Sequence, residues 1–106
     1  MSNQIRLGDI ATARSGDKGN HANIGVIALD PQHYSTLVDQ LTPELIADFF
    51  SHLKVTKVTR YELPKIHALN FVLENVLGGG ASQSLRIDTQ GKLLGTALLE
   101  ITLKPL

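Results

Sequence analysis

The chain has 106 residues, of which 42% are hydrophobic and 19% charged, a composition typical of one globular domain. Ten basic and ten acidic residues cancel, so the excess positive charge that gives proteins non-specific affinity for nucleic acid is missing. The chain has no cysteine, which excludes disulfides and thiolate metal sites. It shows no leader pattern, and no apolar run approaches the ~18 residues of a membrane span. We therefore expect a cytoplasmic protein with no nucleic-acid or membrane partner.

The first part of the chain is predicted to form two strands around a polar loop. Residues 5–13 are predicted to form a strand with a bulge at Gly8. Residues 23–29 are apolar on both alternating faces, which indicates a central strand covered on both sides. Residues 13–25 carry glycines and polar side chains, and residues 14–23 of this segment are predicted to form the loop between the strands.

A pair of helices is predicted next. Asp30 precedes Pro31, and Thr42 precedes Pro43, and each pair predicts the start of a helix. Asp and Thr are common helix caps, and proline is tolerated at the first helical position because the N–H that it lacks would have no partner within the helix. Apolar residues then recur at helical spacing after each start.

The second half is predicted to add three strands and one helix. Residues 55–62 are rich in β-branched side chains, which indicates a strand. Residues 65–77 have apolar side chains at helical spacing and are predicted to form a helix that ends at the glycines of residues 78–80. Residues 84–88 and 93–103 are predicted to form a final hairpin.

About five strands and two helical crossovers favour an α+β fold. We expect a two-layer sandwich in which helices cover one face of a mixed or antiparallel sheet, as a single domain over residues 1–106. The alternative is a doubly wound parallel sheet, because the predicted strand at 55–62 runs directly into a predicted helix.

The polar segment at 13–25 is the most promising site. Glycine-rich loops can turn backbone N–H groups toward an anion, and Arg14 and Lys18 would add positive charge. The phosphate-loop pattern and the RNA-clamping GxxG motif are both disfavoured, because the first needs a following helix and the second a basic domain. Three interpretations stay open: a turn shaped by Asp17 and Asn20, an anion-binding site, or catalysis with Asp17 or His21 as acid or base.

Three further observations concern polar residues elsewhere. Asn70 is predicted to lie on or beside the buried stripe of its helix, where it either bonds to a neighbouring loop or lines the site from below. Arg60 and Glu62 share one face of a strand and are expected to pair. The four histidines show no i, i+4 pair, so no metal site is expected, and no cofactor is implied.

Six ordered motifs resemble those of the AtuA-like ferredoxin-fold domain: ARSGDKGN (13–20), NIGV (23–26), RYELP (60–64), ALNFVL (68–73), GGG (78–80) and SLR (84–86). That domain occurs at the C-terminus of acyclic terpene utilisation proteins and as short stand-alone chains. The resemblance covers nearly the whole sequence. It implies a ferredoxin-like α+β sandwich and a bacterial catabolic setting linked to branched or isoprenoid acyl-CoA breakdown, without established catalytic residues. A ferredoxin-like order has a hairpin between its two crossovers, whereas the residue pattern predicts one strand there, so either a strand is missed or the topology is a variant.

Our first hypothesis is an accessory ligand-binding domain, expected to form a homo-oligomer. It is expected to bind either an anionic small molecule, which would be an acyl-CoA or an organic acid, or a partner enzyme. The predicted ligand-binding residues are Arg14, Ser15, Gly16, Asp17, Lys18, Gly19, Asn20, Asn23, Asn70 and Arg86. The alternatives are a small enzyme acting on an acyl or terpenoid substrate and a structural interaction module in which the polar segment only builds a turn.

Overall fold

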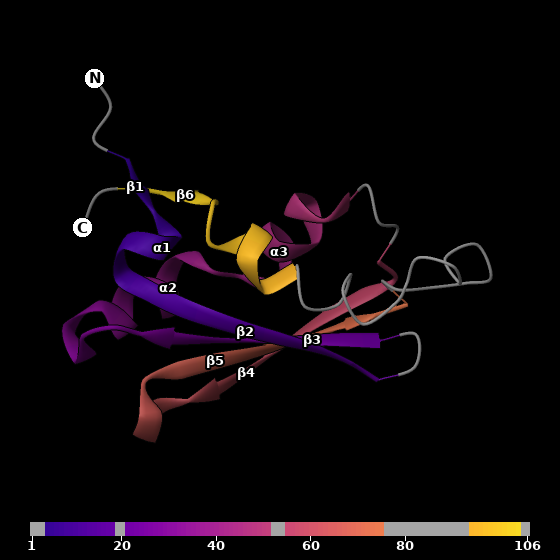
Figure 1. Cartoon of the computed structure of the whole chain (residues 1–106), viewed down its shortest axis with the longest axis horizontal. Coiled ribbons are helices and arrows are strands. Elements are labelled where there is room, and N and C mark those ends of the chain that lie inside the picture. The colour runs from indigo at the N-terminus through magenta and orange to yellow at the C-terminus, as the bar shows by residue number, and fades with distance from the viewer. Residues whose placement is uncertain (1–3, 19–20, 52–54, 76–93, 105–106) are drawn as a thin grey trace.

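Two antiparallel hairpins form the main sheet of the protein. The computed structural model describes residues 4–18, 21–51, 55–75 and 94–104. The first hairpin consists of β2 (Ala11–Lys18) and β3 (His21–Ala28), and the second of β4 (Lys57–Leu63) and β5 (Ala68–Glu74). β3 pairs with β5, which joins the hairpins in the order β2-β3-β5-β4 (Figure 1). All of these pairings are antiparallel, so the α+β sandwich is confirmed and the doubly wound alternative is wrong.

The helices between the two hairpins begin where the sequence predicts. The 3-10 helix η1 (Pro31–His33) leads into α2 (Tyr34–Gln40), and α3 (Pro43–Phe49) follows. The Asp30 carboxylate accepts a hydrogen bond from the Gln32 N–H at 3.1 Å, which caps η1. The Thr42 hydroxyl accepts one from the Leu45 N–H at 3.1 Å, which caps α3. Both predicted caps are confirmed.

The two ends of the chain meet in a second, smaller sheet. β1 (Ile5–Arg6) pairs with β6 (Thr102–Leu103), and α1 (Leu7–Ile10) and the helical segment 94–98 lie beside them (Figure 1). The Arg6 guanidinium donates to the Glu100 carboxylate at 2.8 Å, and this hydrogen bond raises the pKa of Arg6 above its ordinary value. These contacts join the two ends of the described chain.

A single cluster of apolar side chains fills the space between the main sheet and the helices. Side chains alternate along each strand, so every second residue of β3 and β5 points into this cluster. Its most deeply buried members are Leu7, Ile24, Val26, Leu37, Leu41, Ile46, Leu69, Phe71, Leu73 and Leu98. The helices lie on one side of the main sheet, and the other side carries no described helix (Figure 1). We call this second side the outer face.

The helix predicted over residues 65–77 is wrong. The 3-10 helix η3 (Pro64–Ile66) and a left-handed His67, with φ of 55°, make the turn, and β5 follows. Leu69, Phe71 and Leu73 are fully buried in alternation, and each sits opposite a residue of β3. Pairing with β3 and β4 overrides the helical spacing of the same apolar residues. β5 is the missed strand, and with β4 it forms a hairpin between the helices of residues 31–49 and the helical segment 94–98. The topology is a variant as well, because β6 pairs with β1 outside the main sheet.

Three other predictions need correction. The strand predicted over 5–13 is interrupted by α1, because Leu7 and Ile10 both turn into the core and the Asp9 carboxylate accepts from the Arg6 N–H at 3.1 Å. The polar loop predicted over 14–23 is part of the β2–β3 hairpin. The strand predicted over 93–103 is helical at 94–98, where residues four apart are both buried, and extended only at β6. The predicted features at 78–80 and 84–88 lie outside the described residues.

Candidate functional site

The outer face brings several of the predicted site residues together. Strand register places side chains of four strands in rows across this face. One row holds Gly16, Asn23, Val72 and Thr59. The next row holds Arg14, Gly25, Asn70 and Tyr61. Neither row contains an acidic side chain, so the only formal charge in the two rows is that of Arg14.

The outer face is hollowed where these rows meet. A hollow of about 260 Å³ is lined by His21, Ala22, Asn23, Asn70 and Val72, and we call it the sheet hollow. It lies over the central strands β3 and β5, which form one paired surface. The lining therefore combines residues from the first hairpin with residues from the second, and the site exists only when the two hairpins pair.

Two glycines leave space without side chains beside the sheet hollow. A Cβ atom added at Gly16 would lie 3.5 Å from the Asn23 Oδ1 atom, and one added at Gly25 would lie 3.9 Å from the Asn70 Oδ1 atom. On the side of the glycine, each asparagine amide thus lies next to bare backbone of the neighbouring strand. A larger residue at either glycine would occupy the space beside the amide.

The two asparagine amides are half-buried and open to an outside partner. Within the described part of the chain, neither Asn23 nor Asn70 forms a side-chain hydrogen bond. Each amide offers two N–H donors and a carbonyl acceptor. A polar group that is partly withdrawn from water without a partner costs free energy, which a bound ligand would recover.

Arg14 lies at the side of this pair. It is exposed, faces Gly25 across the β2–β3 pair, and forms no ion pair with any described residue. Gly25 has no side chain to separate Arg14 from Asn70 on the far side of β3. The backbones of β2 and β5 are about 10 Å apart, a distance that a long arginine side chain largely spans. Arg14 and Asn70 therefore flank one position above Gly25.

His21 supplies the remaining polar group of the sheet hollow. The Asn75 backbone N–H donates to His21 Nδ1 at 3.1 Å. A ring nitrogen that accepts a hydrogen bond carries no proton, so the neutral imidazole has its proton on Nε2. The free nitrogen of His21 is then a hydrogen-bond donor, which suits binding of an acceptor better than removal of a proton.

The other predicted site residues have different positions. The Ser15 hydroxyl accepts a hydrogen bond from the Gly95 N–H at 2.9 Å, so it contacts the helical segment on the opposite side of the sheet. Asp17 and Lys18 are the last residues of β2, paired with Ala22 and His21, and their side chains are not among the described features. Gly19, Asn20 and Arg86 lie outside the described residues.

Sequence reasoning overlooked two neighbours of the site. Val72 lines the sheet hollow and Tyr61 stands next to Asn70 in its row. Both follow from a period-two pattern: once residues 68–74 are interpreted as a strand, Asn70 and Val72 share one face. The helical interpretation of this segment concealed that relation.

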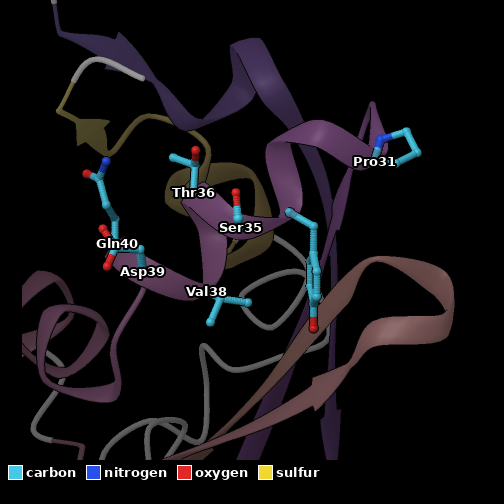
Figure 2. A pocket seen from close by; sticks show the side chains of 7 residues that line it. Pro31, Ser35, Thr36, Val38, Asp39 and Gln40 are labelled. Atoms are coloured by element: carbon cyan, nitrogen blue, oxygen red, sulfur yellow. The ribbon is translucent and has the colours of Figure 1, made fainter.

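A larger hollow, of about 930 Å³, lies over η1 and α2 and is lined by residues between Pro31 and Gln40 (Figure 2). Two of its polar side chains are already used by the fold: the Tyr34 hydroxyl donates to the Ala68 carbonyl at 3.1 Å, and the Gln40 amide forms two hydrogen bonds with the Lys104 backbone. Its lining comes from one continuous run of chain. We therefore favour the smaller sheet hollow, where amides from separate strands converge without partners.

The described part of the chain contains neither a membrane-spanning helix nor a metal-binding cluster. No described helix has the length and apolar character needed to cross a membrane. No three histidine, cysteine or carboxylate side chains of the described residues gather where they would hold a metal ion.

Comparison with protein families decides where this chain belongs. The profile of a family described as the AtuA ferredoxin-like domain matches residues 5–104 of the 106 residues. The chain belongs to this family. The match confirms the resemblance seen in the six motifs, and all residues that line the sheet hollow of this AtuA ferredoxin-like domain fall within the matched span. The comparisons with curated proteins and with solved structures give no match.

Proposed function

We propose that this AtuA ferredoxin-like domain is a ligand-binding accessory domain in terpene utilisation and that Arg14, together with the amides at the adjoining edge of the sheet hollow, binds a small organic acid. One observation carries the proposal: two half-buried amides without described partners lie beside an arginine that has no described counter-ion. Family membership supports the accessory role, and the sheet hollow supports the binding role.

The chemistry of the site matches a carboxylate. The Arg14 guanidinium can donate two parallel hydrogen bonds to a carboxylate, and such charge-assisted bonds are roughly twice as strong as neutral ones. The amide N–H groups of Asn23 and Asn70 and the Nε2–H of His21 are further donors around the sheet hollow. The two rows hold no acidic side chain, and Glu74, which follows Val72 on the outer side of β5, lies opposite the positively charged Lys57 of β4.

Binding fits these residues better than catalysis. The Asn75 N–H engages Nδ1 of His21, so the ring offers the hollow its Nε2–H as a donor and no free base. We therefore propose that any reaction of the bound acid, or of its acyl-CoA ester, takes place on a partner enzyme to which this domain presents it.

Calorimetric titration with sodium butyrate at low ionic strength tests the proposal. Wild-type protein should bind butyrate, and Arg14→Gln and Asn70→Leu should each weaken binding at least tenfold. Lys104→Gln is the matched control, because it removes one exposed positive charge at the far side of the fold and should leave binding unchanged. The proposal fails if wild-type protein shows no binding or if Arg14→Gln binds as well as Lys104→Gln does.

A further inference from the structure

The outer face turns from polar to apolar in the row that follows Arg14 and Asn70. There Ile27, Ala68 and Leu63 lie side by side on β3, β5 and β4. Tyr61 stands next to this row at the edge strand. We call Ile27, Tyr61, Leu63 and Ala68 the apolar track.

The apolar track continues to the end of the sheet. The Ala28 N–H donates to the His67 carbonyl at 2.9 Å, which closes β3 against the start of β5. Leu29 follows β3 directly, and Ile66 precedes His67, so both lie at this closed end. They are 61% and 58% exposed, and Tyr61 and Leu63 on the track are 52% and 42% exposed. These are the large apolar side chains that the described residues leave most open to water.

The apolar track lies next to the row that holds Arg14 and Asn70, on the same face of the sheet. Along a strand the rise is about 3.3 Å per residue, so the row of Ala68 lies about 7 Å from the row of Asn70. Leu29 is four positions after Gly25, so the end of the sheet lies about 13 Å from the position between Arg14 and Asn70. Ala68 itself is buried, so the open apolar surface of the track belongs to Ile27, Tyr61 and Leu63. Exposed apolar side chains grouped in this way usually mark a binding site.

We propose that the ligand is amphipathic: an organic acid with a medium-length hydrocarbon chain, whose carboxylate lies between Arg14 and Asn70 and whose chain lies along the apolar track. This inference rests on the proposed function and adds the chemical class of the ligand. Each further methylene covers more of the track and leaves water itself. The outer face covers only one side of the ligand's hydrocarbon chain, so each methylene gains about half of the free energy of full burial. We therefore expect affinity to rise by about twofold per methylene.

A second copy of the chain is the competing occupant of this face. Stable dimers bury about 800 Å² per partner, which here would extend the contact beyond the track over the rows that carry Arg14. The three rows of one copy contain no carboxylate to neutralise the Arg14 of the other, and burying an unpaired charge is costly. An amphipathic acid brings its own negative charge to Arg14, so we favour it over a second copy.

The experiment is a calorimetric series with straight-chain acids of four, six, eight and ten carbons, below their micellar concentrations, with 1-octanol as an uncharged control. Wild-type affinity should rise with each pair of carbons, and 1-octanol should bind more weakly than octanoate. Leu63→Ser should reduce the gain in affinity per pair of carbons, with the largest loss of affinity for decanoate and the smallest for butyrate. Leu63→Met restores an apolar side chain and should keep the dependence. Leu63 is exposed, so these variants are expected to fold, and circular dichroism checks this.

The outcomes separate the two proposals. If all acids bind equally well, the amphipathic ligand is refuted and the acid-binding function stands. If no acid of any length binds, the proposed function itself fails. If 1-octanol binds as tightly as octanoate, the carboxylate has no role and the inference is overturned. If sedimentation shows a wild-type dimer that Leu63→Ser dissociates and octanoate leaves intact, a second copy occupies the track and the inference is also overturned.

Discussion

Arg60 offers the sharpest test of how the helices are attached to the sheet. Its Nη1 donates to the Val38 carbonyl at 2.8 Å and to the Leu41 carbonyl at 3.0 Å, both near the C-terminal end of α2. The usual donors to these carbonyls are engaged elsewhere, since the Thr42 N–H bonds to the Gln40 carbonyl and the Leu45 N–H to the cap of α3. One arginine on β4 therefore satisfies the carbonyls that the break between the two helices leaves open.

Arg60→Met keeps the apolar stem of the side chain and removes both of these hydrogen bonds. A hydrogen bond to a charged group contributes about 1.5–3 kcal/mol, but the bonds share one donor and the carbonyls can regain water, so we expect a total loss of about 2–3 kcal/mol. Near 100 residues, 1 kcal/mol corresponds to a shift in Tm of about 4–8 °C, so Tm should fall by about 10–20 °C.

Glu62→Gln is the matched control for this variant. The Arg60–Glu62 pair, predicted from the sequence and confirmed at 3.0 Å, leaves the glutamate side chain 51% exposed, whereas that of Arg60 is only 17% exposed. Exposed pairs contribute about 0.2–1 kcal/mol. Urea unfolding followed by circular dichroism measures both variants. The reasoning is refuted if Arg60→Met loses no more stability than Glu62→Gln, because the carbonyl contacts would then contribute nothing beyond the ion pair.

Three further substitutions test the cap of α3, a glycine with space around it and a glycine that is tightly packed. Thr42→Ala removes the hydroxyl that caps α3 and should lower the free energy of unfolding in urea by about 1 kcal/mol. Gly25→Ala adds a methyl group at an ordinary van der Waals distance, 3.9 Å, from the Asn70 amide oxygen; stability should stay level or rise by about 0.5–1 kcal/mol, while the calorimetric affinity for butyrate should fall. Gly95→Ala should instead lower stability by about 1–2 kcal/mol, because its Cβ would lie 3.2 Å from the Ser15 backbone nitrogen, which the strand pairing holds in place. Equal urea midpoints for the two alanine variants would contradict this contrast.

Local signals were sufficient for the parts of the fold that depend on neighbouring residues. Asp30 and Thr42 cap helices through hydrogen bonds to N–H groups two and three residues away, so the caps and the following prolines could be recognised without knowledge of the fold. The central position of β3 was likewise predictable, because a strand covered by neighbours on both edges is apolar along much of its length.

The choice between helix and strand at 65–77 could not be made locally. Leu69 and Leu73 fit a helical stripe, and Leu69, Phe71 and Leu73 fit a buried strand face equally well. The hydrogen-bonding partners that decide the question, β3 and β4, come from other parts of the chain. Once this segment is a strand, the topology changes from one strand between crossovers to a hairpin.

The family, the helix caps and the kinds of polar residue at the site could be recognised in the sequence, because they depend on residue type and on neighbours within a few positions. The shared face of Arg14, Asn23 and Asn70 became visible only in the folded chain, where Ser15, next to Arg14, contacts the opposite side. Strand pairing sets this arrangement: side chains alternate between faces, and the register between distant strands selects which of them become neighbours.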